Sequence, residues 1–153
     1  MSLDLTGGVY EPNSTDREHY HYLINGDGKV IEGKYKPEDN LNCTDGKYAA
    51  HCGGGNTGRI GVALCGMWSS AYPIKRIQLE AMCKLIAQLS IKYKIPINTD
   101  TIITHSEFGQ RNPSTSSFGK VDIDKLPCIA LYSRKSCGDW IRSHTNWYRS
   151  KIQ

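Results

Sequence analysis

Two polar residues in the second half of the chain have the chemistry of metal ligands. His105 directly follows the run Thr101-Ile102-Ile103-Thr104, whose β-branched residues predict a short buried strand. Asp122 closes the segment Gly119-Lys120-Val121-Asp122 further along the chain. Imidazole and carboxylate both bind zinc, and a catalytic zinc needs a third protein ligand beside the position kept for water. From spacing alone, an ordinary hydrogen-bonded surface pair is the favoured interpretation and a zinc site is the alternative.

A lysine close to Asp122 adds a second chemical function. If residues 120–122 are extended, the side chains of Lys120 and Asp122 project toward the same side, because side chains alternate along an extended backbone. A cation there would stabilise negative charge that develops on a substrate oxygen. An ordinary surface charge is the simpler interpretation of the same residue.

The elements that would position these residues begin with a hairpin. Residues 19–33 alternate large and polar side chains around Asn25-Gly26-Asp27-Gly28, a turn sequence that joins two antiparallel strands. Residues 34–58 are polar, lack periodicity and end in a glycine-rich run, so we predict a long loop. Residues 59–67 (RIGVALCGM) are almost uninterruptedly apolar and predict a strand covered on both faces.

Helical periodicity appears later in the chain. Apolar residues at three- and four-residue spacing predict an amphipathic helix from Pro73 to Tyr93, and residues 138–150 predict a closing helix. Residues 106–127 are polar and predict a second long loop. Strands that alternate with helices predict an α/β fold with a central mixed sheet flanked by helices. The 153 residues suit a single domain over 1–153.

Composition limits the classes of partner. The chain is 39% apolar, enough for a core, and its net charge of +4 comes from scattered residues. This charge is below that of a dedicated nucleic-acid binder, and no apolar run approaches the length of a membrane span, so neither partner is expected. Residues 1–10 lack the basic and apolar regions of a classical signal peptide, which predicts synthesis in the cytoplasm.

The six cysteines are widely spaced and form no C-x-x-C pair, which excludes a zinc ribbon. Cys65 lies in an apolar strand-like run and Cys83 on a helix face, where free thiols behave as small buried hydrophobes. We therefore expect most of the cysteines to be reduced core residues. Cys43 and Cys52 flank a loop that would permit a disulfide, and this alternative stays open.

Four segments, in this order and separation, resemble one enzyme family. They are HYHYLINGDGKVIEG (19–33), AAHCGGGNTGRIGVALCG (49–66), ITHSEFG (103–109) and GKVDIDKLP (119–127). Together they resemble the zinc-dependent N-acetylmuramoyl-L-alanine amidases of the type-2 family, which include phage endolysins, AmpD-type recycling amidases and peptidoglycan recognition proteins. The single compact domain looks most similar to phage or prophage endolysins. The resemblance implies the family's α/β fold, Zn²⁺ as cofactor, and peptidoglycan or a muropeptide as substrate.

The resemblance also implies roles for individual residues. His105 matches the family's second zinc histidine and Asp122 its third ligand. Lys120 matches the lysine that stabilises the oxyanion, and Tyr20 matches the tyrosine that assists the bound water in the phage branch. Many relatives carry a catalytic glutamate where this chain has Ala63, which places more weight on Tyr20. Tyr20 as a strand-packing aromatic is the simpler alternative.

His51 and Asn56 flank the glycine-rich run and are expected to line the substrate groove. For His51 the simpler alternative is a solvated loop residue. In the family, the bond cleaved joins N-acetylmuramic acid to L-alanine, and the enzyme uses a zinc-bound water. A non-catalytic peptidoglycan-binding module with a degenerate metal site is the rival function. An endolysin of this kind would reach the cell wall through a phage-encoded pore.

The sequence departs from the family at its first zinc histidine. That histidine normally ends an N-terminal apolar strand, but this chain has Asp4 there, preceded only by Met1-Ser2-Leu3. Either Asp4 replaces the histidine as an oxygen ligand, or the chain begins too late; we favour the second, with the first strand largely truncated. Both alternatives predict weak zinc binding and weak hydrolysis. A lost edge strand would also leave an unpaired sheet edge and favour an edge-strand dimer.

Overall fold

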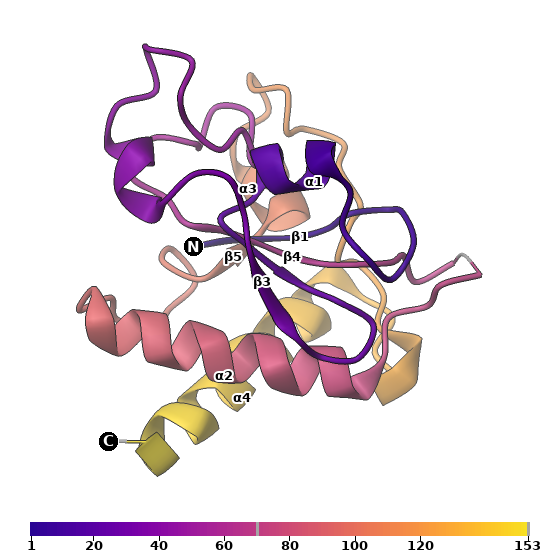
Figure 1. The fold of residues 1–153 in the computed structure, drawn as a ribbon. Coiled ribbons are helices and arrows are strands. Elements are labelled where there is room, and N and C mark those ends of the chain that lie inside the picture. The colour runs from indigo at the N-terminus through magenta and orange to yellow at the C-terminus, as the bar shows by residue number, and fades with distance from the viewer. Residues whose placement is uncertain (70, 153) are drawn as a thin grey trace.

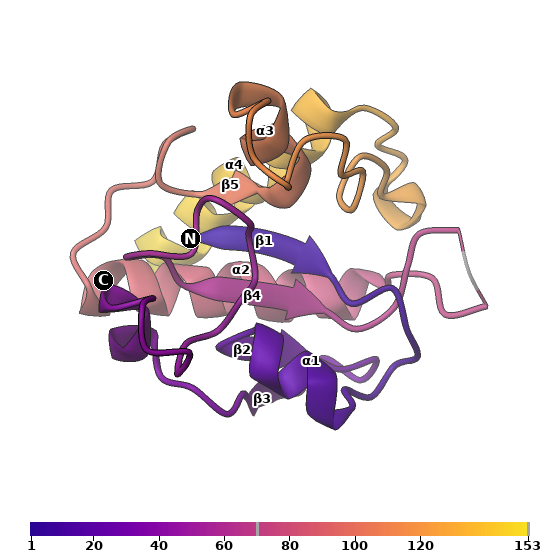
Figure 2. The same cartoon turned by 90° about the horizontal axis from the view of Figure 1, so that it is seen from above.

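The computed structural model describes residues 1–69 and 71–152. Its centre is a five-stranded sheet in the order β3-β2-β4-β1-β5 (Figures 1 and 2). The strands are β1 (Ser2–Leu5), β2 (Tyr22–Ile24), β3 (Val30–Glu32), β4 (Gly61–Leu64) and β5 (Ile103–Thr104). Only the β2–β3 pair is antiparallel among the pairs of this sheet. The predicted central mixed sheet is confirmed.

Helices lie on both sides of this sheet. They are α1 (Ser14–His19), α2 (Arg76–Lys92), α3 (His105–Arg111) and α4 (Arg134–Ile152), with short 3₁₀ helices at Pro37–Leu41 and Pro127–Ile129. The long helices α2 and α4 pack together beneath the sheet, while α1 and α3 lie on the opposite side (Figure 1). The predicted α/β architecture with flanking helices is therefore confirmed.

The first strand is present, contrary to the prediction that it is largely missing. Residues 2–5 form β1, an inner strand that pairs in parallel with β4 along its whole length and with β5 at Ser2 and Leu3. Four residues suffice because β1 is buried on both faces and its neighbours β4 and β5 are no longer than β1. The edges of the sheet are β3 and β5. The dimer was expected because a lost β1 would leave an unpaired sheet edge. Since β1 is present and paired on both sides, this reason for a dimer does not apply.

Alternation along β1 separates the core from the other face of the sheet. Leu3 and Leu5 join the hydrophobic core between the sheet and the two long helices. That core also contains Val62, Leu64, Leu79, Met82, Ile86 and Ile141. Asp4 lies between the two leucines, so its side chain points to the opposite face. Ala63 of β4 is its register partner and is fully buried.

Most predicted elements occur, and two helices were missed. The hairpin forms with Gly28 at φ 82° in its turn, and α2 begins at Arg76, shortly after Pro73. The predicted closing helix at 138–150 is longer and spans Arg134–Ile152. The predicted loop at 106–127 was partly wrong, because its first residues belong to α3. Helix α1 was not predicted; it is short, has no buried residues and depends on an Asn13–Asp16 capping box.

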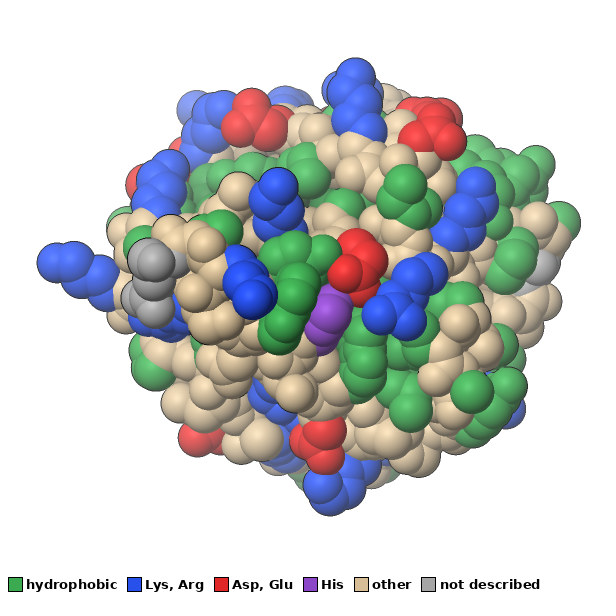
Figure 3. All heavy atoms as spheres, turned by 90° about the horizontal axis from the view of Figure 1, so that it is seen from below, with side chains coloured by type: hydrophobic (Ala, Val, Ile, Leu, Met, Phe, Trp, Pro, Cys, Tyr) green, Lys and Arg blue, Asp and Glu red, His purple; other side chains and the backbone are tan. Residues whose placement is uncertain are grey.

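The surface beneath the sheet mixes side chains of every kind. Figure 3 shows this side from below, with hydrophobic, basic and acidic groups interspersed. No helix within residues 1–69 and 71–152 has the length and apolar character needed to cross a bilayer. All six cysteines are free, and four of them are buried, as expected for reduced core thiols. Cys43 and Cys52 form no disulfide.

Candidate metal centre

Adjacent parallel strands bring Asp4 and His105 together. In the register of β1 and β5, Leu3 lies opposite Thr104, so the next residues of the two strands emerge side by side. The Nδ1 atom of His105 lies 3.0 Å from Oδ2 of Asp4. Both side chains are buried, with 3% of Asp4 and 7% of His105 exposed. The site thus lies at the carboxyl ends of the strands, where α/β sheets commonly bind ligands.

Asp122 approaches the same nitrogen from the loop that follows α3. Its Oδ2 atom lies 3.4 Å from Nδ1 of His105. One donor atom from each of Asp4, His105 and Asp122 lies within 4.8 Å of the others. Oδ2 of Asp122 is buried and has no hydrogen-bond partner among the described residues. An orphaned carboxylate oxygen facing another carboxylate and an imidazole fits a divalent cation, which would satisfy all three groups.

The electrostatics of the three groups indicate a place for positive charge. Burial alone would lower the pKa of His105, but its contacts with Asp122 and Asp4 outweigh burial and raise the pKa to about 11. Burial and the nearby Asp122 charge raise the pKa of Asp4 to about 6. Burial would also raise the pKa of Asp122, but His105 holds it below its usual value. Without a metal, an imidazolium between two carboxylates therefore supplies the positive charge.

Tyr20 contacts the same cluster from the end of α1. Its hydroxyl donates a hydrogen bond of 2.8 Å to Oδ2 of Asp4. Burial and the Asp4 charge raise the pKa of this phenol far above its ordinary value. Tyr20 therefore remains protonated and acts here as a hydrogen-bond donor. It does not act as a strand-packing aromatic, because β2 begins only at Tyr22.

A polar cavity of about 350 Å³ opens onto these residues. Its lining includes the three candidate ligands, Tyr20 and nine further residues: Leu5, Thr6, His19, Ala50, His51, Cys52, Gly53, Ser116 and Lys120. Lys120 is exposed at the rim. The cavity thus brings together every predicted catalytic and metal residue, together with His51.

His51 forms a buried part of the cavity wall, so it is no solvated loop residue. Its ring packs against Gly61 of β4, where a Cβ atom would lie only 2.4 Å from the ring. Burial and the neighbouring His21 lower its pKa to about 3, so the imidazole is neutral. The Nε2–H group donates to the backbone oxygen of Arg59 over 3.3 Å. His51 therefore presents an uncharged imidazole ring to the cavity.

Asn56 is not among the residues that line the cavity. Its side-chain oxygen accepts hydrogen bonds from the backbone N–H groups of His51 (3.0 Å) and Cys52 (2.8 Å). The structure therefore places Asn56 behind the cavity wall, where it shapes the loop that carries His51. The predicted direct contact with substrate is not supported by this placement.

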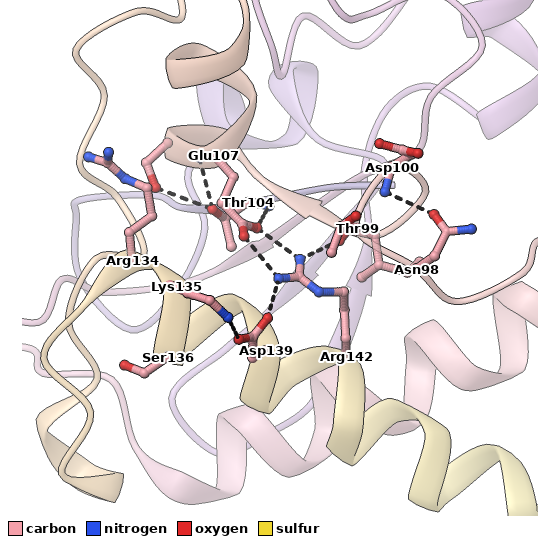
Figure 4. A network of polar contacts seen from close by, with 12 residues as sticks. Asn98, Thr99, Asp100, Thr104, Glu107, Arg134, Lys135, Ser136, Asp139 and Arg142 are labelled. Carbon is pink, nitrogen blue, oxygen red and sulfur yellow. Dashed lines mark hydrogen bonds and ion pairs between the residues drawn. The ribbon is translucent and has the colours of Figure 1, made fainter.

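The helix that follows β5 holds His105 in place. Thr104 and Glu107 form a capping box in which each side chain accepts the other's backbone N–H. The Glu107 carboxylate also accepts hydrogen bonds from both Nη atoms of Arg142, at 3.0 and 2.9 Å, in a buried ion pair (Figure 4). Arg142 further donates to the backbone oxygen of Ile102. Helix α4 thus anchors the segment around His105.

Two residues that lie beside His105 were not predicted from the sequence. Ser117 is fully buried, and its Oγ lies 2.9 Å from Nε2 of His105. Cys52 lies 3.6 Å from the same serine oxygen. Ser117 belongs to a short polar run, Ser114-Thr115-Ser116-Ser117, which has no periodicity and carries no signal of burial. The position of Ser117 beside His105 becomes apparent only in the folded structure, where this run packs against α3.

Comparison with known families decides the membership of this chain. The family model described as N-acetylmuramoyl-L-alanine amidase matches residues 5–118, about three quarters of the sequence. The chain belongs to this amidase family. The matched span includes His105, Tyr20 and His51, whereas Asp4 and Asp122 lie just outside its two ends. No curated protein matches this amidase-family chain significantly.

Two solved structures are similar to the amidase-family chain. The crystal structure of Drosophila peptidoglycan recognition protein SD has 23% identity and a TM-score of 0.44, and the alignment covers 60% of this chain. This chain spans 59% of the length of that protein. The ectodomain complex of peptidoglycan recognition proteins LCa and LCx with tracheal cytotoxin has 20% identity, a TM-score of 0.48, and coverage of 75% and 73% of the two chains.

Proposed function

We propose that this protein is a zinc-dependent peptidoglycan hydrolase that cleaves the amide between N-acetylmuramic acid and L-alanine. The observation that supports it most is the convergence of Asp4, His105 and Asp122 on one polar cavity. Membership of the amidase family supports this choice of bond and substrate class. An endolysin-type role at the cell wall is part of the same proposal and is supported by the sequence resemblance.

Three side chains would hold the metal: His105 through Nδ1, and Asp4 and Asp122 each through one carboxylate oxygen. A bound zinc ion lowers the pKa of its water and polarises a carbonyl. Asp4 stands where the family has a histidine, but it is not on a frayed terminus. It lies on an inner strand, and its second oxygen accepts the backbone N–H of Leu5 at 2.9 Å. The ligand is thus restrained, which removes one reason to expect weak binding.

Two further residues would act in the hydrolysis. Tyr20 keeps its proton and donates it to Asp4, so its hydroxyl oxygen can still accept a hydrogen bond and would orient the attacking water beside the ligand cluster. Lys120 at the rim supplies a positive charge for the oxyanion of the tetrahedral intermediate. Ala63 carries no carboxylate on β4, so no general base comes from that strand position. The neutral ring of His51 would form a wall for the bound muropeptide.

A non-catalytic peptidoglycan-binding module is the second candidate. It is favoured by Asp4, whose ion pair with His105 satisfies both groups without a metal. The cavity would then still bind a muropeptide, with Lys120 and the neutral His51 as contacts. The two candidates differ in whether the scissile amide is broken.

Purified peptidoglycan incubated with the protein separates these candidates. We expect zinc-dependent release of soluble material and a new free amino group on L-alanine, both abolished by a chelator. The His105→Ala variant should release nothing, and Lys120→Ala should be slower by about a hundredfold. Sedimentation of the protein with insoluble peptidoglycan, with no new amino groups at saturating zinc, would instead establish the binding module.

A further inference from the structure

A buried serine lies on the side of His105 that faces away from the candidate ligands. Ser117 is 0% exposed, and its Oγ lies 2.9 Å from Nε2 of His105. The same oxygen lies 2.7 Å from the backbone oxygen of Gly53. The two ring nitrogens of His105 therefore have separate partners, with Ser117 on one and the two aspartates on the other.

The number of protons available fixes the direction of these bonds. A serine hydroxyl has one proton, and a backbone carbonyl can only accept. Ser117 therefore donates its proton to Gly53, and its oxygen accepts from His105. Nε2 of His105 must then carry a hydrogen. In a neutral imidazole this leaves the lone pair on Nδ1, which lies 3.0 Å from Asp4 and 3.4 Å from Asp122.

We infer that Ser117 is a positioning residue, which sets the tautomer and ring orientation of His105 so that Nδ1 faces the metal. The inference rests on the proposed zinc site. Histidine ligands of metals usually donate their second N–H to an oxygen, and such partners raise metal affinity. Here the partner is a hydroxyl whose own proton is committed to Gly53.

The surroundings of Ser117 keep the hydroxyl in place. A Cβ atom at Gly109 of α3 would lie 2.0 Å from the backbone oxygen of Ser117, so a glycine is required for this close approach. That backbone oxygen also accepts the N–H of Lys120. The bond to Gly53 ties the same segment to the glycine-rich loop. Ser117 thus connects His105 with the two segments that carry Lys120 and His51.

Zinc affinity tests this role directly. Affinity is measured by competition with a chromogenic chelator for the wild type, Ser117→Ala and Ser117→Thr. We expect Ser117→Ala to bind zinc about 10- to 100-fold more weakly. Ser117→Thr keeps the hydroxyl and should recover most of the loss. Ser114→Ala, an exposed serine of the same loop, is the matched control and should equal the wild type.

A second measurement needs no variant. Nuclear magnetic resonance of the ¹⁵N-labelled, zinc-loaded wild type reports which ring nitrogen of His105 carries a proton. A proton on Nε2 and zinc on Nδ1 support the inference; the opposite assignment overturns it, as does an unchanged affinity in Ser117→Ala. If the wild type binds no zinc, the proposed metal site fails and this inference fails with it. Zinc binding that is insensitive to Ser117 removes this inference alone.

Discussion

Tyr20 donates its phenolic hydrogen bond to Asp4, over 2.8 Å, at the oxygen that also contacts His105. The other oxygen of Asp4 accepts the backbone N–H of Leu5. Both oxygens of this carboxylate are thus held by the protein. Asp4, the candidate third ligand, therefore has its own supporting contacts, and Tyr20 connects the hairpin side of the cavity to the candidate metal ligands.

Tyr20→Phe should therefore lower both the stability of the protein and its rate of hydrolysis. Loss of one hydrogen bond to a charged acceptor should cost about 1.5–3 kcal/mol of unfolding free energy. The amidase rate should fall by about a hundredfold if the Tyr20 hydroxyl orients the attacking water. Tyr10→Phe removes a tyrosine hydrogen bond to the backbone of Pro73 and is the matched control. Equal rates for the two variants at saturating zinc would contradict a catalytic role for Tyr20.

Replacement of Asp4 by histidine should change the metal preference of the site. Asp4→His exchanges an oxygen donor for a nitrogen donor, and imidazole favours zinc over manganese relative to carboxylate. We expect the ratio of zinc affinity to manganese affinity to rise by at least about tenfold, whatever happens to the absolute values. Competition titrations with both ions measure the ratio. An unchanged ratio would show that Asp4 does not bind the metal.

The buried ion pair behind α3 should be essential for stability. Arg142→Met leaves the buried Glu107 carboxylate without its cation, and breaking such a pair costs about 3–5 kcal/mol of unfolding free energy. Lys135→Ala breaks an exposed pair with Asp139 on the same helix and should cost less than about 1 kcal/mol. Denaturant titrations compare the two. Similar small losses would mean that Arg142 does not anchor the segment around His105.

Local patterns were enough to predict the parts of the fold that bury continuous apolar faces. The run at 59–67 gives β4, and the periodicity after Pro73 gives α2, because each element is specified by its own side chains. Helix α3 has an equally local signal in the Thr104–Glu107 capping box, but the polar composition of the segment suggested a loop. The capping box was therefore a better predictor of helix α3 than the polar composition of the segment.

Long-range contacts account for what sequence reasoning could not supply. The retention of β1 depends on its pairing with β4 and β5, which are distant in the chain. The role of Ser117 depends on a hydrogen bond to Gly53 of the glycine-rich run, and no local pattern marks Ser117. Asn56 shows the converse: its position beside the glycine-rich run suggested a substrate contact, whereas its side chain holds backbone N–H groups of the loop.

The buried His51 should make the protein sensitive to acid. Its folded-state pKa of about 3 lies below the ordinary value of 6.5, so between these pH values the unfolded chain binds a proton that the folded protein does not. The stabilising contribution of neutral His51 is therefore complete above pH 6.5 and is lost as the pH falls toward 3. One such proton corresponds to about 1.4 kcal/mol per pH unit.

His51→Gln cannot take up this proton, so its unfolding free energy should fall less steeply between pH 6 and pH 4 than that of the wild type, by up to about 1.4 kcal/mol per pH unit. His19→Gln changes an exposed histidine of the same cavity and is the matched control. Urea titrations at several pH values give the slopes. Parallel slopes for His51→Gln and the wild type would show that His51 is protonated in the folded protein, and the neutral cavity wall inferred here would be wrong.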